Sequence, residues 1–403
     1  MFDCIVVGKG LLGAAATRYL SQHLPNVAVI GPDEPRDPTH HTGIYGAHYD
    51  ETRLLHRLNA DLVWVELTLR SLAAFVEIER ESGLHFYQPS NSLYVANPTL
   101  GAPVFDVVEA IAARFDLPVE WLDRAGQQAL WPYLHFPAEC RILHERPPSG
   151  ILNPRRLIQA QLHLAELHNA TIIPDIVTAV EEKPDHMVVT TQNGTQYQAR
   201  KVVLASGAFS NSFNLTPQKM TLRLKTEFIL MAQVSPGETH RLGSMPTIIY
   251  DIDSPTINDI YLLPPVRYPD GHTYLKLGAN TSADRAVETL EEICDWYRQG
   301  NSEVMLPALR EALTSILPDV QVEHWRTTRC VITYTPHHHP YIDRLIPGKL
   351  YTAIGGNGQA AQASDAIGRL AAELTLHDRW SDPLAATTFQ LCPANIPFSI
   401  EHN

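Results

Sequence analysis

Three glycines near the start of the chain have the spacing of a phosphate-binding turn. Gly8-x-Gly10-x-x-Gly13 follows the apolar run Ile5-Val6-Val7 and precedes a segment typical of a helix. In such a turn the first glycine permits a tight bend, the second lets the backbone approach a pyrophosphate, and the third lets helix and strand pack closely. The helix N-terminus adds N–H donors and a favourable dipole. The pattern predicts a dinucleotide site with contacts from Gly8, Gly10, Leu11, Leu12 and Gly13.

The acid that holds the ribose in such sites stands at the end of the second strand. Here that position is Gly31, followed by Pro32-Asp33-Glu34. Either Asp33 or Glu34 reaches the ribose from the loop, or the contact is lost. The phosphorylated ribose of NADP needs a cation nearby, and after Gly31 none occurs before Arg36. The turn alone does not distinguish FAD from NAD.

A second glycine turn and one cysteine are further candidates for chemistry. Gly355-Gly356-Asn357-Gly358 lies between a strand-like and a helix-like segment, so it presents N–H groups to a ligand. The five cysteines, Cys330 among them, are far apart and form no CxxC pair. We therefore expect neither a disulfide framework nor a zinc site, and a reducing compartment. The run His337-His338-His339 is interpreted as a polar turn before Pro340, so no metal site is predicted.

The elements that position these residues are mostly those of an α/β fold. Buried strands are expected at 5–7, 27–30 and 201–205, the last ending in Ser206-Gly207. The remaining expectations are a helix from Asp50 through Leu54-Leu55 and Leu67, mixed elements over 86–144, a helix over 157–167, a hairpin over 187–197, antiparallel strands with one helix near 286–298 over 220–325, a strand over 350–354 and a helix over 367–374.

Length and charge narrow the class of protein. A chain of 403 residues is comfortable for two domains. Its 31 Lys and Arg against 44 Asp and Glu give a net charge of −13, which disfavours nucleic-acid binding. The N-terminus lacks the features of a secretory signal, and no stretch reaches the ~20 apolar residues of a membrane span. We expect a cytoplasmic protein that does not bind membranes.

Five segments in order resemble the glycine and D-amino-acid oxidase flavoprotein family, closest to its branch of monomeric sarcosine oxidases and N-methyl amino acid oxidases. They are the first glycine turn, His48 to Arg53, Ser149 to Pro154, Tyr274 to Gly278, and Cys330 to Pro336 continuing through Asp343 to Gly358. The resemblance implies FAD, bound covalently by a thioether from Cys330 to the flavin 8α-methyl carbon. Arg326 and Arg329 are expected to lower the pKa of this thiol. The implied cofactor contacts also include Asp33, Glu34, Thr52, Arg53, Val177, Ser206, Gly207, Gly356, Asn357, Gly358 and Gln359.

The resemblance also implies the catalytic residues, with departures that concern the substrate. It places Arg53 against the flavin ring and Lys276 where a cation assists the reaction of reduced flavin with oxygen. His56, a candidate substrate contact, stands where a sarcosine oxidase has a carboxylate-binding arginine, and 359–363 lacks the lysine that completes this clamp. Asn280 and Ile332 replace a histidine and an aromatic residue. We therefore expect the redox centre to be kept and the carboxylate site to be rebuilt.

These inferences predict a two-domain FAD amine oxidase. The fold is an α/β Rossmann-like FAD-binding domain (1–85, 145–217 and 325–390) with an inserted α+β substrate domain on a mixed or antiparallel sheet (86–144 and 218–324). The expected reaction moves a hydride from the carbon beside an amine to flavin N5; the imine is hydrolysed and oxygen leaves as hydrogen peroxide. The substrate is a small amine or modified amino compound other than simple sarcosine, and the protein is a monomer or small homo-oligomer. The alternatives are a flavin dehydrogenase with another electron acceptor and a non-catalytic FAD-binding subunit.

Overall fold

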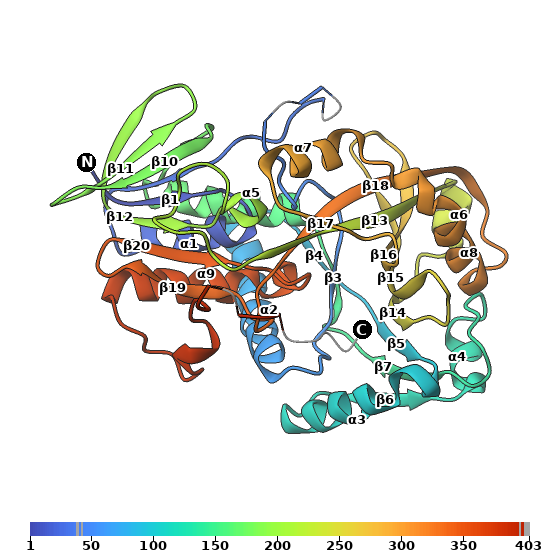
Figure 1. Cartoon of the computed structure of the whole chain (residues 1–403). Helices are drawn as coiled ribbons and strands as arrows, with labels where there is room; N and C mark the ends of the chain where they lie inside the picture. Colours follow the sequence, from blue (N-terminus) through green and yellow to red (C-terminus); the bar gives the residue numbers. More distant parts are fainter. Residues whose placement is uncertain (38–39, 42, 395, 399–403) are drawn as a thin grey trace.

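Two large β-sheets and one small sheet organise the chain in the computed structural model, which describes residues 1–37, 40–41, 43–394 and 396–398. The first large sheet lies on the left of Figure 1 and the second on the right, with the long strands β13 (Arg223–Val234) and β18 (Val322–Tyr334) reaching from the centre into the second. Segments far apart in sequence therefore meet between the two sheets.

The first sheet has a parallel centre in the order β9-β2-β1-β12-β20. Its strands are almost wholly apolar and buried at their centre, as expected for a parallel sheet covered on both faces. An antiparallel meander, β10-β11, extends it from β12, and β19 pairs antiparallel with β20. The bounds are β1 Phe2–Val7, β2 Val27–Ile30, β9 Thr171–Ile173, β10 Val177–Glu182, β11 Met187–Thr191, β12 Gln196–Leu204, β19 Tyr341–Ile346 and β20 Leu350–Ile354.

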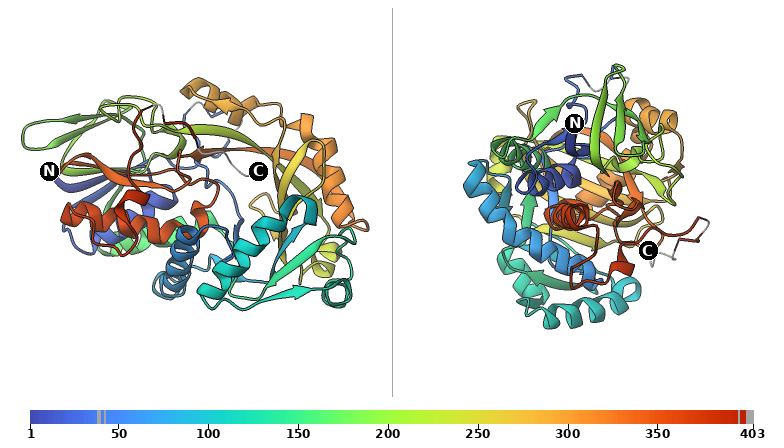
Figure 2. Two further views of the ribbon diagram at one scale, coloured as in Figure 1. Left: turned by 60° about the horizontal axis from the view of Figure 1, so that its bottom comes forward. Right: turned by 90° about the vertical axis from the view of Figure 1, so that its left-hand side faces the viewer.

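Four helices pack against one another beside the first sheet: α1 Leu11–Ser21, α2 Leu62–Ser82, α5 Pro154–Leu167 and α9 Ala360–His377. Figure 2 shows α1 from the start of the chain next to α9 from its end. Gly368 of α9 makes this approach possible, because a Cβ there would lie 2.4 Å from the Cβ of Ala15. The first strand–turn–helix unit thus depends on residues more than 340 positions later, since 368 − 15 = 353.

The second sheet has nine strands in the order β17-β13-β16-β15-β14-β5-β7-β6, with β18 on the other side of β13. All its pairs are antiparallel except β14 with β5. The remaining bounds are β5 Ser92–Ala96, β6 Val119–Leu122, β7 Arg141–Glu145, β14 Thr247–Asp251, β15 Ile257–Arg267, β16 Thr273–Thr281 and β17 Ala286–Val287 in this sheet; β3 Arg53–Leu55, β4 Tyr87–Pro89 and β8 Gly150–Leu152 in the small sheet; and α3 Pro98–Arg114, α4 Arg124–Leu130, α6 Pro236–Arg241, α7 Leu290–Gln299 and α8 Leu306–Ile316.

The predicted fold class is confirmed, and two local predictions are wrong. Leu54-Leu55 lies in strand β3, not in a helix, because residues 53–55 pair with β8, while the Asp61 carboxylate accepts N–H bonds that start α2 at Leu62. Residues 220–325 contain three α-helices, α6, α7 and α8, where a single helix near 286–298 was predicted. The domain bounds stay a prediction. Most of β18 falls in the predicted FAD-binding segment 325–390, yet this strand pairs with β13 of the second sheet.

Candidate active site

A cavity of about 1310 Å³ lies between the two large sheets, at the carboxyl ends of β1, β12 and β20. Ligands of open parallel sheets bind at this edge. Most of the predicted site residues line the cavity: Gly8, Gly10, Leu11, Leu12, Arg53, His56, Val177, Ser206, Gly207, Cys330, Gly356, Asn357, Gly358 and Gln359. Gly13, Asp33, Glu34, Thr52 and Lys276 are not among its lining residues.

The first glycine turn has the geometry that a pyrophosphate needs. Gly8 has φ +101°, and a Cβ there would lie 2.4 Å from the Ala205 carbonyl oxygen. A Cβ on Gly13 would lie 1.8 Å from the Gly8 carbonyl oxygen, so neither position accepts a side chain. Gly10 caps α1 with no side-chain hydrogen bond, which leaves the first N–H groups of the helix available to an anion. The turn therefore fits a dinucleotide.

The two acids expected near the ribose have other partners. Asp33 forms an ion pair with Lys9 and is largely exposed. Glu34 accepts a hydrogen bond from Arg155 at 2.7 Å. The cavity wall between them and β2 is formed by Gly31 and Pro32. The ribose contact of Asp33 or Glu34 remains a prediction that this arrangement does not favour.

The late glycine turn presents a second helix N-terminus to the cavity. Asn357 holds the turn: its Oδ1 accepts the Thr335 N–H at 2.9 Å, and its Nδ2 donates to the Gly355 carbonyl at 2.8 Å. Helix α9 starts at Ala360 without a side-chain cap, and its first residues line the cavity. Its dipole stabilises negative charge there.

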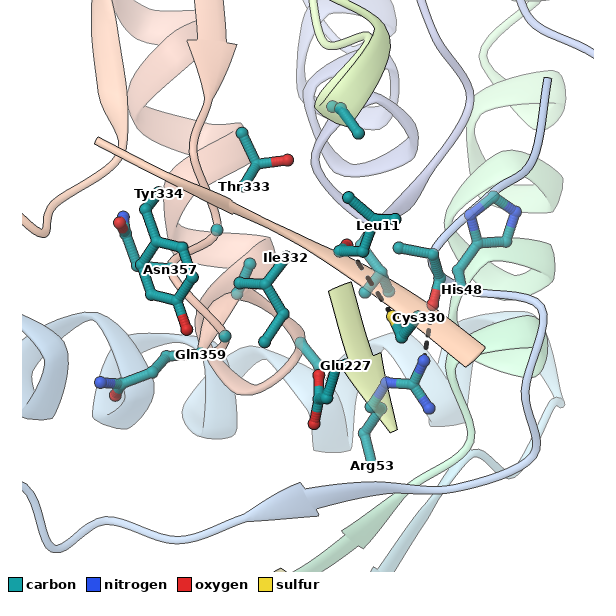
Figure 3. A pocket seen from close by; sticks show the side chains of 18 of the residues that line it. Leu11, His48, Arg53, Glu227, Cys330, Ile332, Thr333, Tyr334, Asn357 and Gln359 are labelled. Carbon is teal, nitrogen blue, oxygen red and sulfur yellow. Dashed lines mark hydrogen bonds between the residues drawn. The ribbon is translucent and has the colours of Figure 1, made fainter. Parts of the chain in front are cut away.

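Cys330 lies within β18 and faces the cavity beside Glu227 of β13, its partner in the sheet register (Figure 3). Burial raises the pKa of the Cys330 thiol and Glu227 adds to this, while Arg53 and Lys276 oppose it. The expectation that Arg326 and Arg329 lower this pKa is wrong. Arg329 donates to the Gly300 carbonyl at 2.6 Å, and the Arg326 guanidinium lies 4.4 Å from the centre of the Tyr274 ring.

Two predicted cations share one carboxylate beneath the cavity. Lys276 is fully buried, and its Nζ lies 2.6 Å from Asp50 Oδ2 and 3.0 Å from the Thr52 carbonyl. Arg53 also pairs with Asp50 and donates to the Ala47 carbonyl at 2.6 Å. Burial opposes ionisation of Asp50, yet Arg53 and Lys276 hold its pKa well below its ordinary value. Thr52 Oγ1 is buried and has no hydrogen-bond partner among the described residues, although Thr52 does not line the cavity.

His56 follows β3 and lines the cavity as a neutral group. Its Nδ1 donates to the Leu58 carbonyl at 2.5 Å, and burial lowers its pKa to about 4. The neighbouring Arg57 is turned away, because it pairs with buried Glu145 at 2.6 Å. Residues 359–362 line the cavity with no cation. None of these neighbouring residues therefore supplies a cation in place of the carboxylate-binding arginine and lysine that the sequence lacks.

Glu227, Tyr261 and Asp50 were not identified as site residues from the sequence. Glu227 is 8 % exposed and lines the cavity, and burial raises its pKa to about 7. Tyr261 also lines the cavity, and its pKa is raised by desolvation and by Glu227. The sequence does contain one signal for Glu227: it is the only charged residue in the segment 226–232.

The histidine run has structural partners. His339 Nε2 lies 2.7 Å from the carboxylate of Asp61, and His337 Nε2 lies 3.0 Å from the Gln390 carbonyl. Across the described part of the chain, no three His, Cys, Asp or Glu side chains form a group able to hold a metal ion. Nor does any described helix have the length and apolarity to cross a membrane.

A Rossmann-like sheet, two glycine turns and a cavity of this size are the features of a dinucleotide-binding protein. Comparison with known families makes the class specific. The model of the family described as FAD dependent oxidoreductase matches residues 3–374. The chain therefore belongs to this family, and the predicted family and enzyme class are confirmed.

The relatives are named as oxidases of amino compounds. The chain is 27% identical over 383 residues to a monomeric sarcosine oxidase of Bacillus sp. (strain B-0618), covering 93% of this chain and 92% of the relative. It is 26% identical over 412 residues to an N-methyl-L-tryptophan oxidase of Escherichia coli O127:H6 (strain E2348/69 / EPEC), covering 96% and 100%. Among solved structures, NikD, titled an unusual amino acid oxidase, matches with a TM-score of 0.76 at 18% identity over 99% of both chains. An L-proline dehydrogenase from P. horikoshii matches with a TM-score of 0.73 at 18% identity over 96% of both.

Proposed function

We propose that the protein oxidises the C–N bond of a small amine with FAD held in the central cavity. FAD supplies the acceptor for the hydride equivalent that leaves the carbon beside the nitrogen. The observation that carries the proposal is the convergence, in one cavity, of the first glycine turn, Cys330 and the N-terminus of α9 in a chain of this family. The names of the relatives support an amine as the substrate.

The protein groups have roles that follow from their positions. The uncapped N–H groups at the start of α1 bind the pyrophosphate, and the start of α9 stabilises negative charge on the reduced cofactor. Asp50 holds Arg53 and Lys276 in place. Lys276, buried with its pKa lowered chiefly by burial and then by Arg53, provides a positive field for oxygen reduction from beneath the cavity wall.

The substrate is not simple sarcosine. A buried carboxylate is costly without a bidentate cation. His56 is neutral near pH 7, and Arg57 is engaged with Glu145. Within the described residues, Lys9 and Arg53 are the only Lys or Arg side chains lining the cavity, and each already has a carboxylate partner.

Four features remain specific proposals. Cys330 carries the flavin through a thioether, supported by its position in the cavity wall and by its segment. Oxygen is the electron acceptor, and the protein acts in the cytoplasm, as its five free cysteines suggest. It acts as a monomer or a small homo-oligomer.

Anaerobic mixing of the holoenzyme with a panel of amines tests the function. We expect at least one non-carboxylate amine to bleach the flavin and air to restore the colour with hydrogen peroxide. Reduction without peroxide indicates a dehydrogenase, and no reduction by any amine indicates a non-catalytic subunit. Acid precipitation tests the attachment: the yellow colour stays in the pellet of the natural protein and leaves that of Cys330→Ser. Colour lost from both contradicts the thioether.

A further inference from the structure

One row of polar side chains crosses the floor of the cavity on five neighbouring strands. Cys330 of β18 pairs with Glu227 of β13, and Asn280 of β16 pairs with Asp259 of β15. The register joins these pairs, because Phe228 is opposite Ala279, which places Glu227 next to Asn280. Directly opposed residues in an antiparallel sheet point to the same face. Tyr250 of β14 is opposite Ile260 of β15, so the next residue, Asp251, is opposite Asp259. The carboxylates of Glu227, Asp259 and Asp251 therefore lie on the same face of the sheet.

All five side chains line the cavity. Neighbouring strands lie about 4.8 Å apart, so Glu227 and Asp259 are separated by roughly 10 Å across the sheet, and Glu227 and Asp251 by roughly 14 Å. The row thus begins at the proposed flavin-bearing Cys330 and continues away from it as an acidic surface.

The carboxylate of Glu227 has no partner among the described residues of this surface and can bind a positively charged group of a ligand. It is 8 % exposed and faces the cavity beside Cys330 (Figure 3), and the structure gives its carboxylate no hydrogen bond or ion pair within the described chain. The nearby cations are committed elsewhere: Lys225 binds Asn280 and Asp284, and Arg53 and Lys276 share Asp50. A buried carboxylate left in this state is costly, and a bound cation removes the cost.

The two outer carboxylates, Asp251 and Asp259, lie close enough for their charges to interact. Burial raises the pKa of Asp251 to about 6, and the charge of Asp259 adds to this. Asp259 accepts two hydrogen bonds from Asn280 Nδ2, each of 2.9 Å, which fix its position in the row. A second positive charge on the ligand relieves the repulsion between Asp251 and Asp259.

We infer that the substrate is a diamine or polyamine, with the reacting amine at Glu227 and a further ammonium group at Asp259 and Asp251. This inference rests on the proposed function and gives its substrate class. A chain of several methylene groups connects the two sites, and the apolar side chains of Ile229 and Ile332 also line the cavity. A substrate with an α-carboxylate is repelled by the same row.

The test compares matched amines on the holoenzyme, measuring affinity by isothermal titration and reactivity by anaerobic flavin reduction. N-methylputrescine and spermidine carry a second charge, whereas N-methylbutylamine carries one and sarcosine carries a carboxylate. We expect the two polycations to bind about 10-fold or more tightly than N-methylbutylamine, as befits one added charged hydrogen bond. Asp251→Asn removes this advantage and leaves the affinity for N-methylbutylamine unchanged. The exposed Asp185→Asn serves as the control and leaves both affinities unchanged.

The outcomes separate the two proposals. Equal affinity for the monoamine and the polycations, or tightest binding of sarcosine, overturns the substrate class whether or not the flavin is reduced. Preferential binding of polycations without flavin reduction supports the acidic row and refutes the oxidase function. Because Asp251→Asn keeps the shape of the side chain, a variant that retains flavin and loses polycation selectivity supports the row directly.

Discussion

The buried carboxylate of Glu227 leads to a prediction about stability. Its pKa is raised from 4.5 to about 7, chiefly by burial, so between these values the folded protein binds a proton that the unfolded chain has released. Raising the pH through this window therefore lowers the free energy of unfolding. At about 1.4 kcal/mol for each pKa unit, the full change corresponds to about 3 kcal/mol. In the Glu227→Gln variant the side chain is neutral at every pH, so this loss of stability does not occur.

Urea unfolding of the natural protein and of Glu227→Gln, without amine, at about pH 5 and about pH 8.5 measures this effect. We expect the variant to gain about 3 kcal/mol relative to the natural protein between the two conditions. The exposed Glu166→Gln is the control and leaves the pH dependence unchanged. A difference between Glu227→Gln and the natural protein that is the same at both pH values refutes the argument, because it means that Glu227 ionises alike in both states.

Three further predictions concern the cofactor and the reaction. Gly13→Ala places a Cβ 1.8 Å from the Gly8 carbonyl, so the purified variant has a low ratio of flavin to protein absorbance, whereas Gly237→Ala keeps it; full flavin in Gly13→Ala contradicts the geometry of the turn. Lys276→Met slows reoxidation of reduced flavin by air by about 10²-fold in stopped-flow experiments, since it removes a positive charge near the reacting oxygen, and an unchanged rate rejects this role. His56→Asn keeps the shape of the kcat/KM profile between about pH 5 and 8, since burial lowers the pKa of His56 to about 4; an inflection that disappears with the substitution argues against it.

The glycine turns and the residues of the resembling segments were predictable because their signals are local. Gly8 to Gly13 and Gly355 to Gly358 each stand between a strand and a helix in the sequence itself, and the structure confirms both settings. Cys330 is likewise found at the cavity, as its segment indicated.

What the sequence did not reveal depends on partners far along the chain. Leu54-Leu55 is apolar enough for a helix and becomes a strand because β8, about 100 residues later, supplies its pairing. Glu227 becomes a site residue only through the register that brings β13 beside β18. Arg329 is close to Cys330 in sequence, yet it donates to the Gly300 carbonyl. Sequence proximity therefore misassigned the charges around the thiol, which come from Glu227, Arg53 and Lys276.

The contact between α1 and α9 has a consequence for biosynthesis. The glycine turn and α1 leave the ribosome first, but Ala15 and its neighbours pack against Gly368 of α9, which is made near the end of translation. The nascent chain therefore exposes this small-residue face of α1 until α9 arrives, and a partly made chain holds the nucleotide turn without its support. Cofactor capture is thus a late, largely post-translational event, and a chain that stops before α9 is expected to leave the ribosome as a flavin-free target for chaperones and proteases.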